Sequence, residues 1–526
     1  MSWCLSLLLL GSFVLATPAW AGKSADIKKA NELLRRWRAS EAEKLLKPYL
    51  KDRFQTNAFL WAMARTRFYQ GKYKDGMALM KRVNSDEKQL MRYPMYRAMK
   101  AAHKVTKNYK EVQSPHFTIA YPPGPDKVLV PYAIQALEKA YKELGDLYGY
   151  RPPTRVRIEI LKTAMNLADM SPLTEGDIVR TGTIALCKYN RVMITSPRAL
   201  YRGYRWLDTL VHEYTHLVIN RVVAGIPIWM HEGLARFSET LWRKHDPEHL
   251  SPYSETLLAR AVKKDKLITF KQMHPSMAKL PSQEDAALAY AQVFMLIKYF
   301  VKNNGRSGIA RVLQEIHRGK KVPDAFSKIV RMPFPQYLEV WKHDLRQQKL
   351  KEYNDLAPEK KVLKGHAPKK KKEKDKRNFW FRPTSPKELG ARFLQLAELL
   401  RMNKRNKAAL LEYLKAAKYW KNLRPKLQNK IAKTYFILRQ HNRAIPHLKH
   451  SLKLHPNYVT THVNMGRAFY KLRKWKQAIL SFTEAAHINP FHPQVHLYLS
   501  KIYRILGKET KAHRSTQNYQ LVRRHQ

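Results

Sequence analysis

The segment from Leu210 to Val218 carries the clearest chemical pattern in the sequence. Within it, His212 and His216 are four residues apart and therefore lie on one face of a helix. Two imidazoles at this spacing can hold one zinc ion, and Glu213 between them can reach a water at the metal. A buried helix whose histidines only form hydrogen bonds is the competing interpretation.

A second group of polar residues follows, with 15 residues between His216 and Glu232. The segment from Pro227 to Glu239 contains the adjacent pair His231 and Glu232, followed by Gly-Leu-Ala. Either side chain could supply a third metal ligand. On an ideal helix the two point about 100° apart, so they compete for the position that faces the histidine pair.

With both segments in view, the sequence resembles the gluzincin metallopeptidases, the clan of thermolysin and aminopeptidase N. It is most similar to the peptidase MA-like group that is often fused to tetratricopeptide repeats. This resemblance implies that Glu232 is the third zinc ligand in preference to His231, and that Glu239 orients a ligating imidazole from behind. The 15-residue separation is shorter than is usual in aminopeptidase N, so the subfamily stays open.

The resemblance also covers a later helix. Residues 286–300 look like the helix that follows the zinc helices in this group, which places Tyr290 near a tyrosine that stabilises the oxyanion. A core aromatic is the other interpretation of Tyr290. A Gly-x-Met-Glu-Asn motif is missing from the sequence, which disfavours an aminopeptidase and favours an endopeptidase.

The implied mechanism is hydrolysis of a peptide bond by a metal-activated water. Zn²⁺ held by His212, His216 and Glu232 keeps one position for water and lowers its pKa toward ~7. Glu213 acts as the general base and then passes the proton to the leaving amine. The oxyanion is stabilised at zinc, with Tyr290 as a possible second contact.

Periodicity indicates the elements that must hold these residues. From Trp206 to about residue 350 the pattern is mostly helical. Before it, apolar runs and alternation predict a helix at about 130–148 and strands at 117–121, 156–160, 184–187 and 192–194. Strands followed by helices predict an α+β domain over 112–350, in the place where the resemblance implies a zincin-like fold.

The two flanking regions look helical and repetitive. Residues 22–111 contain small and aromatic residues typical of a tetratricopeptide hairpin, with its turn at Tyr69–Tyr73. In residues 387–526 several columns recur every 34 residues, which is the tetratricopeptide period: Ala432/Gly466, Tyr435/Phe469/Tyr503 and Ala444/Ala478/Ala512. Such units must stack to bury their apolar faces, so this region predicts a superhelix that binds a protein partner.

The formal net charge of +58 raises the question of an anionic partner. Basic residues are spread along the whole chain, which is typical of solvated helix faces. The densest run, Lys369–Lys372, lies in a Pro- and Lys-rich segment, 351–386, that we interpret as a basic linker. Contact with an anionic envelope surface or polymer is the alternative, and the sequence predicts no specific nucleic-acid partner.

The N-terminus indicates export. An apolar stretch from Leu5 to Leu15 ends before Ala19-x-Ala21, a small-x-small cleavage pattern, which predicts a signal peptide over residues 1–21. An uncleaved anchor is the alternative. Cleavage would leave Cys187 as the one cysteine, which excludes an internal disulfide. We therefore expect a periplasmic or secreted protein.

The sequence thus predicts a mainly α, multidomain chain: an α+β zincin-like metallopeptidase domain flanked by α-helical tetratricopeptide-type repeats. The expected function is an exported zinc-dependent peptidase that acts on peptides or proteins. A catalytically inactive repeat scaffold and a basic cell-envelope binding protein are the alternatives. The first alternative is disfavoured because His212, Glu213, His216 and Glu232 are all present.

Overall fold

The computed structural model describes residues 18–53, 55–244, 246–247, 249–353, 356, 363–365, 385–420 and 424–525. The chain divides into two compact units, with the division between Lys100 and Ala101. Residues 1–17 of the expected signal peptide and most of the expected linker, including Lys369–Lys372, lie outside the described residues. Among the helices described, none combines the length and the apolar character that a membrane span requires.

The first unit is built from helices. The turn expected at Tyr69–Tyr73 joins α3 and α4, which pack as a hairpin through buried aromatic residues such as Phe68 and Tyr73. The helices are α1 (Pro18–Arg35), α2 (Ala39–Leu46), η1 (Lys47–Lys51), α3 (Asn57–Tyr69), α4 (Tyr73–Val83), α5 (Glu87–Leu90) and α6 (Pro94–Thr106), whose end reaches past the division.

The second unit begins with a five-stranded sheet whose strand order is β1-β2-β3-β5-β4. The two central pairs are parallel and the two outer pairs antiparallel. Ile119 faces Ile158, and Ile158 faces Val192, so the sheet has an apolar centre. The strands are β1 (Lys110–Gln113), β2 (Phe117–Tyr121), β3 (Val156–Leu161), β4 (Ala185–Lys188) and β5 (Arg191–Thr195).

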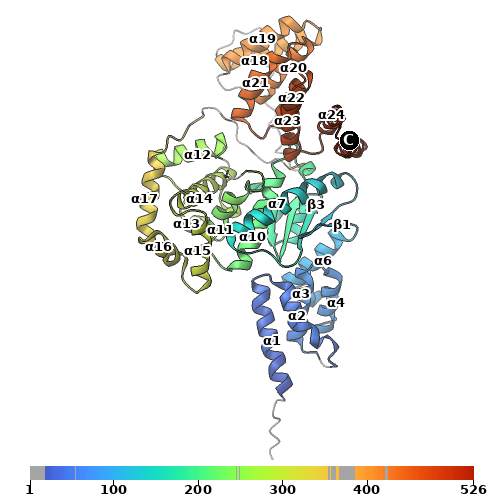
Figure 1. Ribbon diagram of the computed structural model, residues 1–526, viewed down its shortest axis with the longest axis vertical. Helices are drawn as coiled ribbons and strands as arrows, with labels where there is room; N and C mark the ends of the chain where they lie inside the picture. Colours follow the sequence, from blue (N-terminus) through green and yellow to red (C-terminus); the bar gives the residue numbers. More distant parts are fainter. Residues whose placement is uncertain are drawn as a thin grey trace, which may run out of the picture. The chain divides into compact units, whose positions relative to one another are not determined.

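Two long helices pack on this sheet (Figure 1). Helix α7 (Val130–Tyr148) connects the parallel strands β2 and β3, and α10 (Trp206–Val222) packs against α7, β4 and β5. The remaining helices before the linker are η2 (Pro125–Leu129), α8 (Met165–Met170), α9 (Glu175–Thr181), η3 (Pro197–Ala199), α11 (Ile228–Ser238), α12 (Pro252–Lys263), α13 (Phe270–Met273), η4 (Met277–Lys279), α14 (Gln283–Asn304), α15 (Ser307–His317), α16 (Val322–Val330) and α17 (Phe334–Gln347).

The repeat domain, residues 385–525, consists of four helical hairpins. Helices α20, α22 and α24 begin 34 residues apart, as do α21, α23 and α25, and Ala444, Ala478 and Ala512 are fully buried. The helices are α18 (Pro386–Met402), α19 (Asn406–Tyr419), α20 (Pro425–Ile437), α21 (His441–Leu454), α22 (Val459–Lys471), α23 (Trp475–Ile488), α24 (Pro493–Ile505) and α25 (Glu509–Arg523).

The predicted fold class is confirmed: a mainly helical chain with one small sheet and helical repeats. The four expected strands are present, but β1 was not predicted, and it straddles the expected start of the α+β domain at residue 112. The reason is that β1 has the sequence Lys-Glu-Val-Gln and is largely exposed, so it lacks the apolar alternation that marks a strand.

Candidate metal centre

Helix α10 sets the position of the motif residues because one side of it is buried in the domain. Leu210, Val211, Tyr214, Leu217 and Val218 are all inaccessible to solvent, in a helix that packs against α7, β4 and β5. The opposite side carries the two histidines, whose ring centroids are 4.8 Å apart. Ligand atoms of His212, Glu213 and His216 lie within 4.8 Å of one another, which is a spacing that a metal ion can bridge.

Glu232 on α11 completes this group. Its Oε2 lies 3.1 Å from Nε2 of His212 and 3.4 Å from Nε2 of His216. Ligands about 2.0–2.1 Å from a tetrahedral metal are about 3.3 Å from one another. The Glu232 carboxylate oxygen therefore already lies at ligand-to-ligand distance from both imidazole nitrogens.

His231 also approaches His216 on α10, but at the ring nitrogen that Glu232 does not contact. Its Nδ1 lies 2.8 Å from Nδ1 of His216, whereas Glu232 approaches Nε2 of that ring. Burial and the neighbouring His216 lower the pKa of His231 to about 3, so His231 is neutral and its Nδ1 can accept a hydrogen bond from Nδ1–H of His216. That hydrogen bond would leave the Nε2 lone pair of His216 available for a metal.

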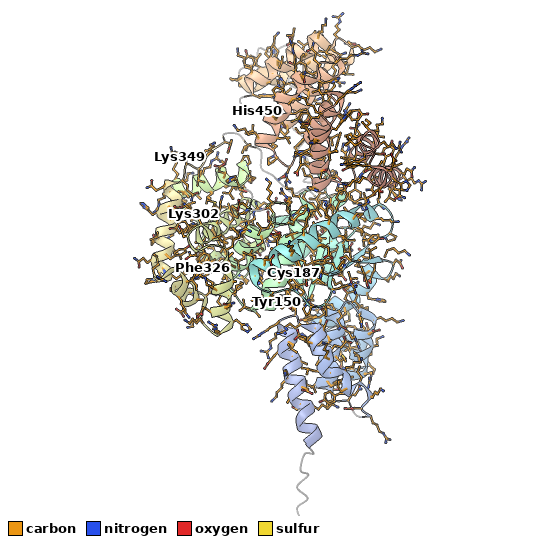
Figure 2. The ribbon with its side chains drawn as sticks, in the orientation of Figure 1. Tyr150, Cys187, Lys302, Phe326, Lys349 and His450 are labelled. Atoms are coloured by element: carbon orange, nitrogen blue, oxygen red, sulfur yellow. The ribbon has the colours of Figure 1, made fainter. Side chains whose placement is uncertain are left out.

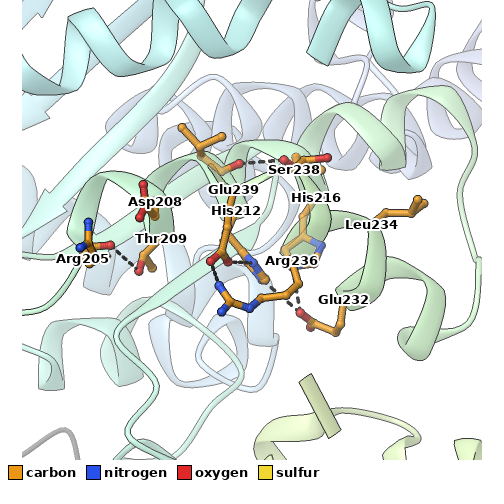
Figure 3. A network of polar contacts seen from close by, with 12 residues as sticks. Arg205, Asp208, Thr209, His212, His216, Glu232, Leu234, Arg236, Ser238 and Glu239 are labelled. Carbon is orange, nitrogen blue, oxygen red and sulfur yellow. Dashed lines mark hydrogen bonds and ion pairs between the residues drawn. The ribbon is translucent and has the colours of Figure 1, made fainter. Parts of the chain in front are cut away.

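Glu239 can accept a hydrogen bond from the other imidazole, that of His212, as His231 does from His216. Its Oε2 lies 3.2 Å from Nδ1 of His212, and its other oxygen forms an ion pair with Arg236 (Figure 3). If His212 donates Nδ1–H to Glu239, its Nε2 lone pair faces the Glu232 carboxylate at 3.1 Å. Two acceptors at this distance repel unless a proton or a cation lies between them, so the donor set fits a metal.

Close packing fixes α11 in the orientation that turns Glu232 inward. A Cβ at Gly233 would lie 2.8 Å from Cγ1 of Ile297 and 3.0 Å from the Val293 carbonyl oxygen on α14. Glycine is therefore required for α11 to approach α14 this closely. At the end of α11, Ser238 Oγ is 2.7 Å from the Tyr148 hydroxyl of α7, which ties the helix to the domain core.

Tyr290 lies beside the metal-ligand group, on α14. Its ring centroid is 6.2 Å from that of His212. Burial, together with the charges of Glu232 and Glu213, raises its pKa well above 10, so its hydroxyl keeps its proton and can donate a hydrogen bond. Burial also raises the pKa of Glu213, and the charges of His216 and His212 act in the opposite direction.

Comparison with protein families gives a match that covers these helices. Residues 134–345 match the family model described as the Peptidase MA superfamily. These residues form a Peptidase MA domain. The matched range contains α10, α11 and α14, which carry the metal-ligand group, Glu213 and Tyr290.

Two further comparisons concern curated proteins and solved structures. A comparison with curated proteins gave no significant match. Solved structures that match include the MamA protein (20% identity, TM-score 0.25, 26% of this chain and 74% of that chain). Two others are YrrB, titled a TPR protein with an unusual peptide-binding site (15%, 0.24, 25% and 68%), and TTC0263, a thermophilic TPR protein of Thermus thermophilus (23%, 0.23, 25% and 72%).

Sequence reasoning missed several residues that support the site in the Peptidase MA domain. Asp208 accepts hydrogen bonds from Arg243 and from the Trp242 indole, and it joins the segment after α11 to α10. Asp208 lies four residues before His212, on the same helix face, which was a usable signal. The contact of His231 with His216 and that of Arg236 with Glu239 could not be predicted from the sequence, because both depend on how α11 packs.

The candidate site opens onto a large cleft through His212, Glu213 and Tyr290. This cleft has a volume of about 2190 Å³. Ile184 and Ala185, at the start of edge strand β4, line it as well. Cys187, which lies further along β4 and is labelled in Figure 2, is buried and has a free thiol. A cleft of this size exceeds the ~300–1,000 Å³ that is usual for small-molecule sites, so it suits a polymeric ligand.

Proposed function

We propose that this protein is a zinc-dependent peptidase. The observation that carries the proposal is the approach of the Glu232 carboxylate to both Nε2 atoms, 3.1 Å from His212 and 3.4 Å from His216. Two imidazoles and one carboxylate are a ligand set used by catalytic zinc, because three protein ligands leave one coordination position for the reaction. Cysteine thiolates, which predominate in structural zinc sites, are not among the side chains of this group.

The metal would supply Lewis-acid polarisation of the scissile carbonyl and a lowered pKa for the attacking water. Glu213 faces the cleft beside the ligands, so its carboxylate would take the proton of the attacking water and deliver it to the leaving nitrogen. Tyr290 would donate its hydroxyl proton in a hydrogen bond to the oxyanion. Edge strand β4 would align the substrate backbone by adding it as a further strand.

Export is part of the same proposal. The apolar stretch from Leu5 to Leu15 and the pattern Ala19-x-Ala21 support a signal peptide over residues 1–21 and a periplasmic or secreted location. The repeat domain would bind a protein or peptide, since stacked helical hairpins offer a long surface for extended partners. An inactive scaffold remains the competing function, and activity distinguishes the two.

The test combines zinc analysis with the Glu213→Gln variant. We expect purified wild-type protein and Glu213→Gln to contain one zinc per chain, and only the wild type to cleave a mixed peptide library. An amide cannot accept the proton of water, while the metal ligands stay unchanged. Zinc-free wild-type protein, or undiminished cleavage by Glu213→Gln, would contradict the proposal.

A further inference from the structure

The repeat domain contacts the Peptidase MA domain at the start of the metal-binding helix α10. The Trp206 indole donates to the Ala486 carbonyl (3.3 Å), and the Tyr204 amide donates to the Ile488 carbonyl (3.0 Å). Gly203, with φ of +70°, has no room for a side chain, because a Cβ would overlap the Ile488 carbonyl oxygen. His212 follows Trp206 by six residues, about 9 Å along the helix axis.

Polar and aromatic contacts extend this interface. Arg205 donates to Asn457 (2.7 Å) and to the Glu484 carboxylate (3.0 Å). The Trp242 ring is 5.4 Å from that of His487. The end of α23 is therefore held against the same segment that positions the metal ligands.

This contact makes the repeat domain one wall of the cleft. The lining includes His212 and Glu213 on one side and, on the other, a set of repeat residues that we call the repeat wall: Ser385, Pro386, Tyr419, Trp420, Arg424, Pro425, Lys426, Lys453, His455, Pro456, Asn457 and Tyr458. A chain bound in this cleft can therefore contact both His212 and the repeat wall.

The repeat wall is basic. Among its described residues there are three cations, Arg424, Lys426 and Lys453, all exposed, and no Asp or Glu. Arg424 lies over the Trp420 ring, with 4.5 Å between guanidinium and centroid. On the opposite wall Asp208 is paired with Arg243 and Glu239 with Arg236, and the carboxylates of Glu213 and Glu255 also line the cleft there. The repeat side of the cleft thus has uncompensated positive charge.

We propose that the repeat wall selects peptide substrates with acidic side chains, which contact Arg424, Lys426 and Lys453 while the scissile bond lies at the metal-ligand group. This rests on the proposed peptidase function. A peptide is the favoured occupant because the cleft combines cations with the aromatic rings of Tyr419, Trp420 and Tyr458 and with edge strand β4, which can pair with a peptide backbone. A uniformly anionic polymer would use only the cations.

The experiment uses the full chain with zinc and two degenerate peptide libraries, identical except that fixed positions hold Glu in one and Gln in the other. We expect the Glu library to be cleaved about three- to tenfold faster, since a few solvent-accessible ion pairs supply that much discrimination. Raising the salt concentration should reduce this preference. The variant Lys426→Glu/Lys453→Glu should lose it through a higher KM with unchanged kcat.

A matched control variant introduces the same change in charge at a surface that does not line the cleft. Lys476→Glu/Lys501→Glu alters two exposed lysines of α23 and α24 that do not line it, and it should keep the wild-type preference. Equal cleavage of the two libraries, or equal effects of the two double variants, would overturn the inference while leaving the peptidase function in place.

A binding measurement separates the inference from the function on which it rests. A fluorescein-labelled Glu peptide should bind Glu213→Gln protein, and Lys426→Glu/Lys453→Glu in that background should weaken binding about three- to tenfold. Binding without any cleavage by the wild type would reject the peptidase and keep the repeat wall as a binding site. If polyphosphate binds at these lysines and the Glu peptide does not, the peptide assignment is wrong.

Discussion

Helices α10 and α22 both bury polar side chains, but in different chemical surroundings. In α10 the buried His212 and Glu213 lie among other ionisable groups and line the cleft. In α22 the buried His462 has a neutral partner, the Pro456 carbonyl oxygen, which lies 2.7 Å from its Nε2 and accepts a hydrogen bond. Burial of a histidine therefore does not by itself mark a functional site.

The contact made by His462 recurs in the next repeat, which indicates that this histidine has a structural role. His496, 34 residues after His462, makes the same contact with Pro490, which is 34 residues after Pro456 (2.6 Å). Asn464 likewise donates to Asn429 in the preceding hairpin (2.6 Å). The recurrence of the His–Pro contact every 34 residues indicates a role in stacking the helical hairpins. The His-Glu-x-x-His motif that contains His212 occurs once, and Glu232 approaches both of its histidines.

The largest effect is expected from removing a proposed metal ligand. His212→Ala should lose zinc and all peptidase activity, because only two ligands remain. Zinc analysis and library cleavage measure this. The near-ultraviolet circular dichroism of the variant should match that of zinc-free wild type. Full zinc content in His212→Ala would place the metal elsewhere.

A smaller effect is expected from changing Glu239, which contacts the proposed ligand His212. Glu239→Gln should keep the fold and bind zinc about 10–100-fold more weakly, because His212 loses a charged partner that orients its ring. Competition with a zinc chelator gives the affinity. An affinity equal to that of the wild type would mean that Glu239 serves only Arg236.

The matched substitution in α22 should affect stability and not zinc. His462→Ala leaves the Pro456 carbonyl without its partner, which should cost about 1–3 kcal/mol of unfolding free energy. Urea denaturation measures the loss, and zinc content should stay at the wild-type value. Zinc loss from His462→Ala would undermine the contrast between the two helices.

The smallest effect concerns the contact between the two domains. Although burial opposes it, His487 (3.7 Å) and Arg205 hold the pKa of Glu484 below its ordinary value of 4.5. His462 also faces this group. A depressed folded-state pKa stabilises the fold above the ordinary pKa, and this contribution is lost as the pH falls below it.

Glu484→Gln should therefore reduce the unfolding free energy by about 1–2 kcal/mol at pH 7, after allowance for the partly exposed pair. The difference from the wild type should shrink as the pH falls below 4.5. Urea denaturation at neutral pH and at a pH below the ordinary glutamate pKa measures both values. A difference that is independent of pH would show that the Glu484 charge does not hold the domains together.

The sequence alone determined the local patterns of this protein. The four-residue spacing of His212 and His216 places both on one helix face, and the 34-residue columns predict stacked hairpins, because helix periodicity depends only on neighbouring residues. The strands with apolar alternation were predictable for the same reason. The polar β1 was not, since its pairing with β2 is all that makes it a strand.

Only the tertiary structure decided which side chains meet. Glu232 and His231 are neighbours in sequence, and the packing of α11 on α14 through Gly233 turns the first toward both Nε2 atoms and the second toward Nδ1 of His216. The catalytic roles of these residues stay predictions. The contact of α23 with the start of α10, and with it the basic wall of the cleft, joins segments about 280 residues apart, as in the Trp206–Ala486 hydrogen bond. No local periodicity encodes such a contact, because it depends on the shapes of two folded surfaces.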